Sequence, residues 1–243
     1  GRQNRATKLE TNERLRKLLK GTPSGRYKKY SLTRTGLQEI ISKMLNIARN
    51  ERGYHGNDLT CRDLAAIFQG KTWSDAGWIV GQGHEKLRFH PMDKFPECYS
   101  NKMPDRAISL SWDGFSLLND LRPFLNEYEK AVTPTLVGET TYWLAVTFND
   151  HNSNNARRFL EIEIADILYS GAEKHVAFMR DGILNQAHCC REVVTRLRAV
   201  LDDPELTQGL DQTEAIIRAG EMIEEGRGGD ACTAFVVVPG RTR

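Results

Sequence analysis

The chain of 243 residues is 40% hydrophobic and 27% charged, and its formal net charge is +2 at pH 7. These proportions are typical of a globular protein that folds as one large domain or two small ones. They exclude a membrane-spanning helix, because no apolar run reaches about 18 residues. We also expect no secretory signal, because the first residues are polar and basic.

The cysteines and histidines predict no metal site and no other cofactor. The six histidines are dispersed, and the cysteines lack the paired spacing of zinc ligands. We therefore expect reduced cysteines in a cytoplasmic, nucleoid or nuclear compartment. The five cysteines are Cys61, Cys98, Cys189, Cys190 and Cys232.

The small net charge hides two strongly charged ends. The first 35 residues carry eleven Lys or Arg and two Glu, whereas residues 201–230 carry nine acidic residues and two Arg. A concentrated basic segment beside a globular body is typical of a protein that binds a polyphosphate. The alternatives are a solvated leader, or a basic segment that docks on the acidic part of a neighbouring subunit.

Residues 1–35 are predicted to form a basic arm with one helix and a Gly/Pro hinge. The helix spans Thr11–Lys20, the hinge lies at 21–25, and a basic cluster with two tyrosines follows at 26–30. Lys and Arg neutralise phosphates, and tyrosines stack on unpaired bases. The predicted phosphate contacts are Arg14, Arg16, Lys17, Lys20, Arg26, Lys28, Lys29 and Arg34.

Residues 36–132 are predicted to form a helical domain. One helix follows a cap at Thr33 or Thr35 and ends near Gly53, and another follows Asp58 or Thr60 and ends at Gly70. The next segments are a loop or short strand over residues 84–104 and a helix over residues 112–128, which a proline at position 123 should kink.

The same domain has the pattern of a helix-turn-helix or winged-helix reader of DNA. Its recognition helix would span Ser74–Val80, with an apolar anchor at Trp78 and a tight turn at Gly70. The alternative is a small helical subdomain that does not enter a DNA groove. The predicted base-side contacts are Lys71, Thr72 and Ser74.

Residues 139–243 are predicted to form a helical assembly domain with an acidic end. The expected elements are a strand or helix start at 140–148, helix over 156–201, an acidic helix over 205–225 and a strand at 234–238. One apolar stripe recurs at intervals of three and four, which is typical of helix pairing within a core or between subunits. Its residues are Ile183, Ala187, Cys190, Val194, Leu197 and Leu201.

Three acidic residues near His175 suggest a metal-dependent enzyme as a further alternative. Carboxylates at Glu161, Glu163 and Asp166 would suit Mg²⁺ and phosphodiester chemistry. In a helix, however, Glu161 and Glu163 point about 200° apart, which prevents a shared metal. We therefore interpret them as a solvated helix surface and predict no catalytic residue.

These patterns together predict a mainly α protein, an α-rich α+β fold with a few short strands. The predicted function is non-enzymatic nucleic-acid binding, as a DNA-binding regulator or accessory factor, with DNA favoured over RNA. A homo-oligomer is expected, because two basic arms brought together would match a two-fold DNA site. A nucleocapsid or coat-type protein that packages nucleic acid is the alternative.

Overall fold

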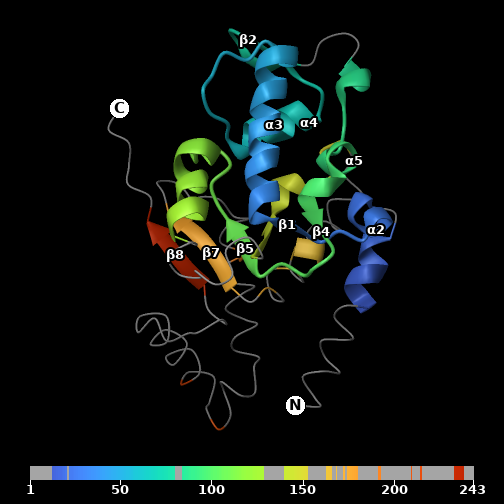
Figure 1. Cartoon of the computed structure of the whole chain (residues 1–243), viewed down its shortest axis with the longest axis vertical. Coiled ribbons are helices and arrows are strands. Elements are labelled where there is room, and N and C mark those ends of the chain that lie inside the picture. The colour runs from blue at the N-terminus through green and yellow to red at the C-terminus, as the bar shows by residue number, and fades with distance from the viewer. Residues whose placement is uncertain are drawn as a thin grey trace.

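The computed structural model describes residues 13–20, 22–79, 84–128, 140–152, 174–179 and 233–237, with shorter stretches at 163–165, 168, 172, 191–192, 209 and 214. They form a mixed α/β fold, with helices around a central sheet (Figure 1). The prediction of an α-rich α+β protein is therefore right in its mixture of elements, but it underestimates the sheet. No helix of the described residues has the length and apolarity to cross a membrane.

The central sheet combines strands from the whole chain in the order β4-β1-β6-β5-β7-β8. Strands β6, β5, β7 and β8 run parallel, while β1 is antiparallel to both β4 and β6. The strand bounds are β1 Ser31–Thr33, β4 Tyr99–Ser100, β5 Arg106–Ser109, β6 Thr141–Leu144, β7 Lys174–Met179 and β8 Thr233–Val237.

Strand β1 continues directly into the long helix α3, Arg34–Arg52. The helix begins where the Thr33 side chain accepts a hydrogen bond from the backbone N–H of Gly36, and it ends at Gly53 in the left-handed conformation. Its apolar face, which includes Ile40 and Met44, is fully buried against the sheet. The predicted helix and both of its predicted ends are confirmed.

Helix α4, Cys61–Phe68, is confirmed as well, with Thr60 and Asp63 forming a reciprocal capping box. The segment that follows is not a helix. Strands β2, Thr72–Ser74, and β3, Gly77–Ile79, form an antiparallel hairpin. The predicted recognition helix at Ser74–Val80 is wrong over its described residues, because Trp73 and Trp78 pair across the hairpin and contact each other edge to face.

The segment from His84 to Pro104 contains short elements, as expected. They are the single turns η1, His84–Leu87, and η2, Pro96–Cys98, the short helix α5, Pro91–Lys94, and strand β4. The predicted helix over 112–128 is present only from Leu117 onward, as two π-helical stretches, η3, Leu117–Leu121, and η4, Phe124–Tyr128, on either side of Pro123.

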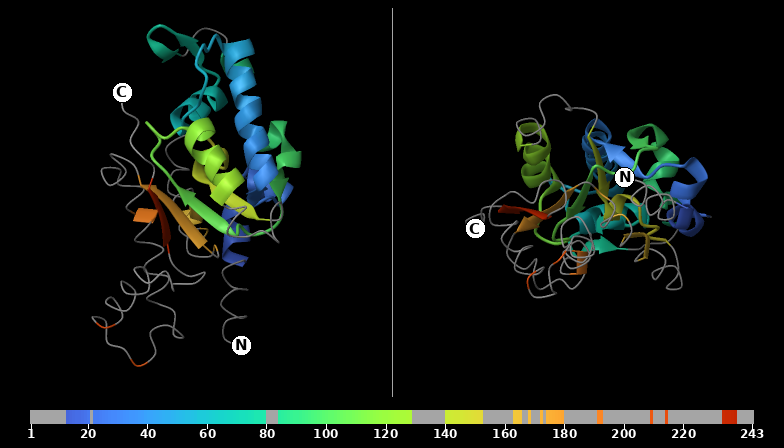
Figure 2. Two further views of the ribbon diagram at one scale, coloured as in Figure 1. Left: turned by 60° about the vertical axis from the view of Figure 1, so that its left-hand side comes forward. Right: turned by 90° about the horizontal axis from the view of Figure 1, so that it is seen from below.

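Two hydrophobic clusters cover opposite faces of the sheet. One face carries Ile108 and Val176 and packs against α3, α4, η3 and η4. The other carries Ala107 and Trp143 and packs against the helical residues 13–19 and against Ile164, Leu168 and Ala172. Figure 2 shows the green helix over residues 117–128 beside α3 on the same side of the sheet.

The C-terminal half differs most from expectation. Helix was predicted throughout 156–201, but β7 lies inside that range. The apolar run from Val176 to Phe178 is buried. The prediction failed here because a short buried strand and a buried helical turn have the same continuous apolar sequence. Residues 140–148 form strand β6 followed by the turn η5, Ala145–Thr147, and the predicted terminal strand is confirmed as β8.

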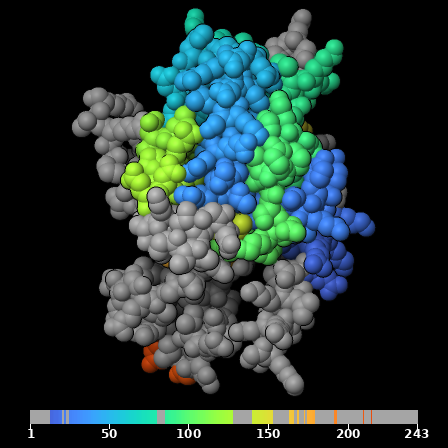
Figure 3. Space-filling view, viewed as in Figure 1, coloured from blue at the N-terminus to red at the C-terminus, as the bar shows by residue number. Residues whose placement is uncertain are grey.

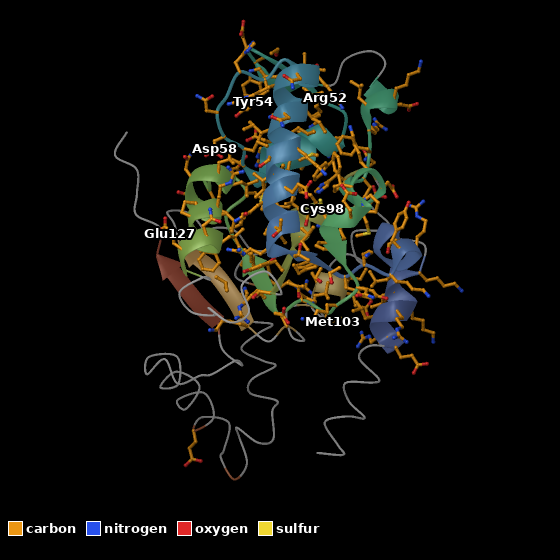
Figure 4. All side chains as sticks on the ribbon, in the orientation of Figure 1. Arg52, Tyr54, Asp58, Cys98, Met103 and Glu127 are labelled. Carbon is orange, nitrogen blue, oxygen red and sulfur yellow. The ribbon has the colours of Figure 1, made fainter. Side chains whose placement is uncertain are left out.

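Asp58 joins the start of α4 to the start of η3. Its Oδ1 accepts from the backbone N–H of Leu59 at 2.7 Å and of Leu118 at 2.9 Å. Its Oδ2 accepts from the Ser116 hydroxyl and the Asn119 side-chain amide. Figure 4 shows Asp58 at the upper end of the helix that η3 begins. This carboxylate satisfies backbone donors that a helix start leaves unpaired.

Replacing Asp58 by Ala should destabilise the fold by about 2–3 kcal/mol, because several donors lose a charged acceptor. Urea denaturation of the purified chain measures the change. The matched control is Asp113→Ala, which removes an exposed ion pair with Arg62 and should cost less than about 1 kcal/mol. Equal losses in the two variants would contradict the bridging role of Asp58.

Two desolvated histidines hold the segment after β6 in place. The Nε2 of His151 donates to the Val146 carbonyl at 2.8 Å, and its ring packs against Phe68. The Nε2 of His90 lies 3.3 Å from the Phe148 carbonyl, and its Nδ1 accepts from the Met92 N–H. Burial lowers the pKa of both histidines, against a smaller raising effect of these carbonyls.

Stability should therefore fall as the pH drops below the unfolded histidine pKa of about 6.5, because the unfolded chain binds protons first. Above that pH both histidines are neutral in the folded and the unfolded chain, and their full contribution to the free energy of unfolding is present. Unfolding free energies measured across this range should show a flatter slope in His151→Phe. A slope of wild-type steepness in His151→Phe would contradict this assignment.

Candidate functional site

The predicted phosphate contacts lie on an ordered part of the molecule. Helical residues 13–19 bury Leu15 and Leu19 against the sheet, and α2, Pro23–Tyr27, follows after a short turn. The expected hinge at residues 21–25 therefore contains the start of α2. Figure 3 shows this region, in blue, along the lower right edge of the molecule.

Six cationic side chains there are exposed, and the four that have no ion-pair partner among the described residues define what we call the basic surface: Arg16, Lys17, Lys20 and Lys28. Within the described part of the chain, none of the four forms an ion pair, and Lys29 beside them is half-buried. Lys28 also has a left-handed backbone with a φ of 54°, which is uncommon for a residue other than glycine.

The other three predicted contacts already have partners. Arg14 pairs with Glu163, and Arg26 lies 2.8 Å from an Asp93 carboxylate oxygen. The Nη1 of Arg34 donates to the Leu125 carbonyl at 3.1 Å. These contacts join the basic segment to the rest of the protein, and the acidic partners of Arg14 and Arg26 offset the charge that these exposed side chains offer to phosphate.

The predicted base-side contacts do not lie on a recognition helix. Lys71, Thr72 and Ser74 are half-buried in or beside the hairpin, and the Ser74 hydroxyl donates to the Gly77 carbonyl at 3.3 Å within the turn. No element of the described residues therefore presents them as a DNA-reading helix. The apolar stripe predicted for assembly, from Ile183 to Leu201, lies outside the described residues.

The predicted acids do not gather around His175. Glu163 binds Arg14, whereas the buried His175 lies on β7 and binds Ser109. Glu161 and Asp166 lie outside the described residues. Glu163 and His175 therefore bind different partners in different parts of the molecule, and the two side chains do not form one metal site.

Among the described residues, one cluster has metal-ligating side chains close together: Glu39, Glu97 and Cys98. The Nζ of Lys43 lies 2.9 Å from a Glu39 oxygen and 2.8 Å from a Glu97 oxygen. These hydrogen bonds raise the pKa of Lys43 well above its usual value, while burial raises the pKa of Cys98 to about 12. The ammonium group supplies the positive charge that the carboxylates need, and the thiol stays protonated.

A different site follows from the order of the parallel strands. The chain passes from β5 to β6 on one side and then crosses back to β7 on the other. The η3 and η4 helices of the first connection cover one face, and Ile164, Leu168 and Ala172 of the second pack on the opposite face. This portion of the sheet has the strand order of a doubly wound α/β sheet. Such sheets bind ligands beyond the carboxyl ends of the strands where the order reverses, here β5 and β7.

A polar cluster begins at the carboxyl end of β5 and reaches back to His175, the second residue of β7. Ser109 is the last residue of β5, and its Oγ lies 2.7 Å from the Nε2 of His175 on β7. The same hydroxyl donates to Oε2 of Glu192. Ser109 and His175 are 1% and 0% exposed, whereas Glu192 is half-buried. The carboxylate thus stands between two buried polar groups and the surface.

The helix that follows β5 has no place for a phosphate at its start. Asp58 accepts from the Leu118 N–H, and Asp120 accepts from the Ser116 N–H at 2.8 Å. A phosphate on these donors would meet two carboxylates. The cluster of Ser109, His175 and Glu192 is therefore better suited to a ligand that donates hydrogen bonds than to an anion.

Sequence reasoning missed Ser109 and Glu192 and gave His175 a different role. No element was predicted for residues 105–111, although an apolar run ahead of the turn residues 113–114 is the signal of a short buried strand. Comparison of the chain with protein-family models, curated proteins and solved structures finds no match.

Proposed function

We propose that the chain binds a small hydroxyl-bearing molecule, such as a sugar or the ribose of a nucleoside, at the carboxyl end of β5. The observation that carries the proposal is the hydrogen bonding of Ser109, the last residue of β5, to both His175 and Glu192 beside the place where the strand order reverses. Carboxylates accept hydrogen bonds from hydroxyl groups, and they do so more strongly than neutral acceptors.

A carboxylate in this position is also suited to chemistry on the ligand. Glu192 is half-buried, and a partly desolvated carboxylate can take a proton from a bound hydroxyl or return it. The site therefore supports an enzyme that uses Glu192 as a general acid or base.

A second candidate function is nucleic-acid binding without base reading. The exposed cations of the basic surface, which form no ion pair with the described residues, favour it, because Lys and Arg release counterions from a phosphate backbone. With a hairpin in place of the recognition helix, the proposal is a non-enzymatic phosphate-binding protein. A DNA accessory factor and a coat-type protein are both compatible with it, as is a homo-oligomer.

Isothermal titration calorimetry with D-ribose, adenosine and ATP as separate probes tests the first proposal. The probe that binds wild type should lose at least about tenfold in affinity in Glu192→Gln, because the charged acceptor is removed. Glu127→Gln, on the exposed side of η4, is the control and should bind as wild type does. The proposal fails if none of the three probes binds, or if both variants bind equally well.

The second candidate predicts salt-dependent binding to DNA or RNA of any sequence. The double substitution Lys17→Gln and Lys20→Gln should flatten the slope of log affinity against log salt by about 0.9 for each lost contact with duplex DNA. The control, Lys86→Gln with Arg88→Gln, removes the same charge from exposed positions elsewhere. Salt-independent binding, or the same slope in both double variants, would exclude the basic surface as the contact.

A further inference from the structure

The hydrogen bonds around Ser109 have only one consistent direction when Glu192 is ionised. A carboxylate oxygen can only accept, so the single hydroxyl hydrogen of Ser109 points at Oε2 of Glu192. The Ser109 Oγ must then accept from His175, whose Nε2 lies 2.7 Å away. The proton of this imidazole is thereby placed on Nε2.

We propose that Ser109 and His175 are positioning residues that hold Glu192 as an ionised, oriented carboxylate. The relay, as we name it, runs from the Nε2–H of His175 to Oγ of Ser109 and from that hydroxyl to Oε2 of Glu192. The proposal rests on the ligand site proposed above and adds how its carboxylate is prepared.

The strands make this relay rigid. In the parallel register Ala107 pairs with His175 and Ser109 pairs with Ala177, so Ser109 and His175 lie on the same face of neighbouring strands. Both residues are buried, and the strands that carry them lie inside the sheet. Glu192 therefore meets a donor whose position is set by backbone pairing, which is the arrangement that keeps a functional group oriented.

The test is ¹⁵N NMR of the imidazole ring of His175 in the full chain near neutral pH. Wild type should show a proton on Nε2. In Glu192→Ala the carboxylate that fixes the Ser109 hydroxyl is lost, so the Nε2 chemical shift of His175 should change. Ser109→Thr keeps the hydroxyl and should retain the wild-type shift. A bare Nε2 in wild type, or an unchanged Nε2 shift in Glu192→Ala, would overturn the relay.

This readout needs no ligand, so it separates the relay from the ligand site. If a probe from the calorimetric series binds, Ser109→Ala should weaken its binding by about tenfold through loss of the supporting hydrogen bond, and Ser109→Thr should restore it. Ligand binding that depends on Glu192 but not on the Ser109 hydroxyl would retain the site and reject the relay. The wild-type tautomer remains decisive even if Ser109→Ala does not fold.

Discussion

The position of β5 between two parallel neighbours is the constraint on which the rest of the structure depends. Its four residues are buried on both faces of the sheet, and hydrogen bonding to β6 and β7 fixes its register. Because alternate residues of a strand face opposite ways, Ile108 enters the cluster under α3 while Ala107 enters the cluster under residues 13–19. The same alternation directs Ser109 toward the face of His175.

The strand order then determines where a ligand can be reached. The connections before and after β6 cover opposite faces, which leaves the carboxyl ends of β5 and β7 without a shared crossover. A one-residue slip of β7 against β5 would move His175 to the other face. The polar cluster therefore depends on both the strand order and the register, and a change in either one would separate its residues.

The sequence predicted those elements whose signals are local. Helices α3 and α4 were located because Thr33, Gly53 and Thr60 cap them and their apolar residues recur at helical spacing. Strands β5 and β7 were missed or read as helix because a short strand buried on both faces shows no alternation. The hairpin was read as a helix for a related reason: each of its strands is three residues long.

The candidate site could not be found from local signals. Ser109 meets His175 across 66 residues of sequence and Glu192 across 83, so only the sheet brings them together. The charge asymmetry of the sequence did locate the basic surface, because exposure of Lys and Arg is the default for these residue types. It could not show that Arg14 and Arg26 bind acidic residues of the same chain.

The two functional proposals place the ligand on different parts of the molecule, so mapping one ligand that suits both separates them most directly. ATP carries ribose hydroxyls and phosphates, and backbone amide shifts of the labelled chain report where it lies. The account predicts the largest shifts at residues 109–112, at residues 177–179 and at Glu192. Shifts confined to Arg16, Lys17, Lys20 and Lys28 would contradict the central claim.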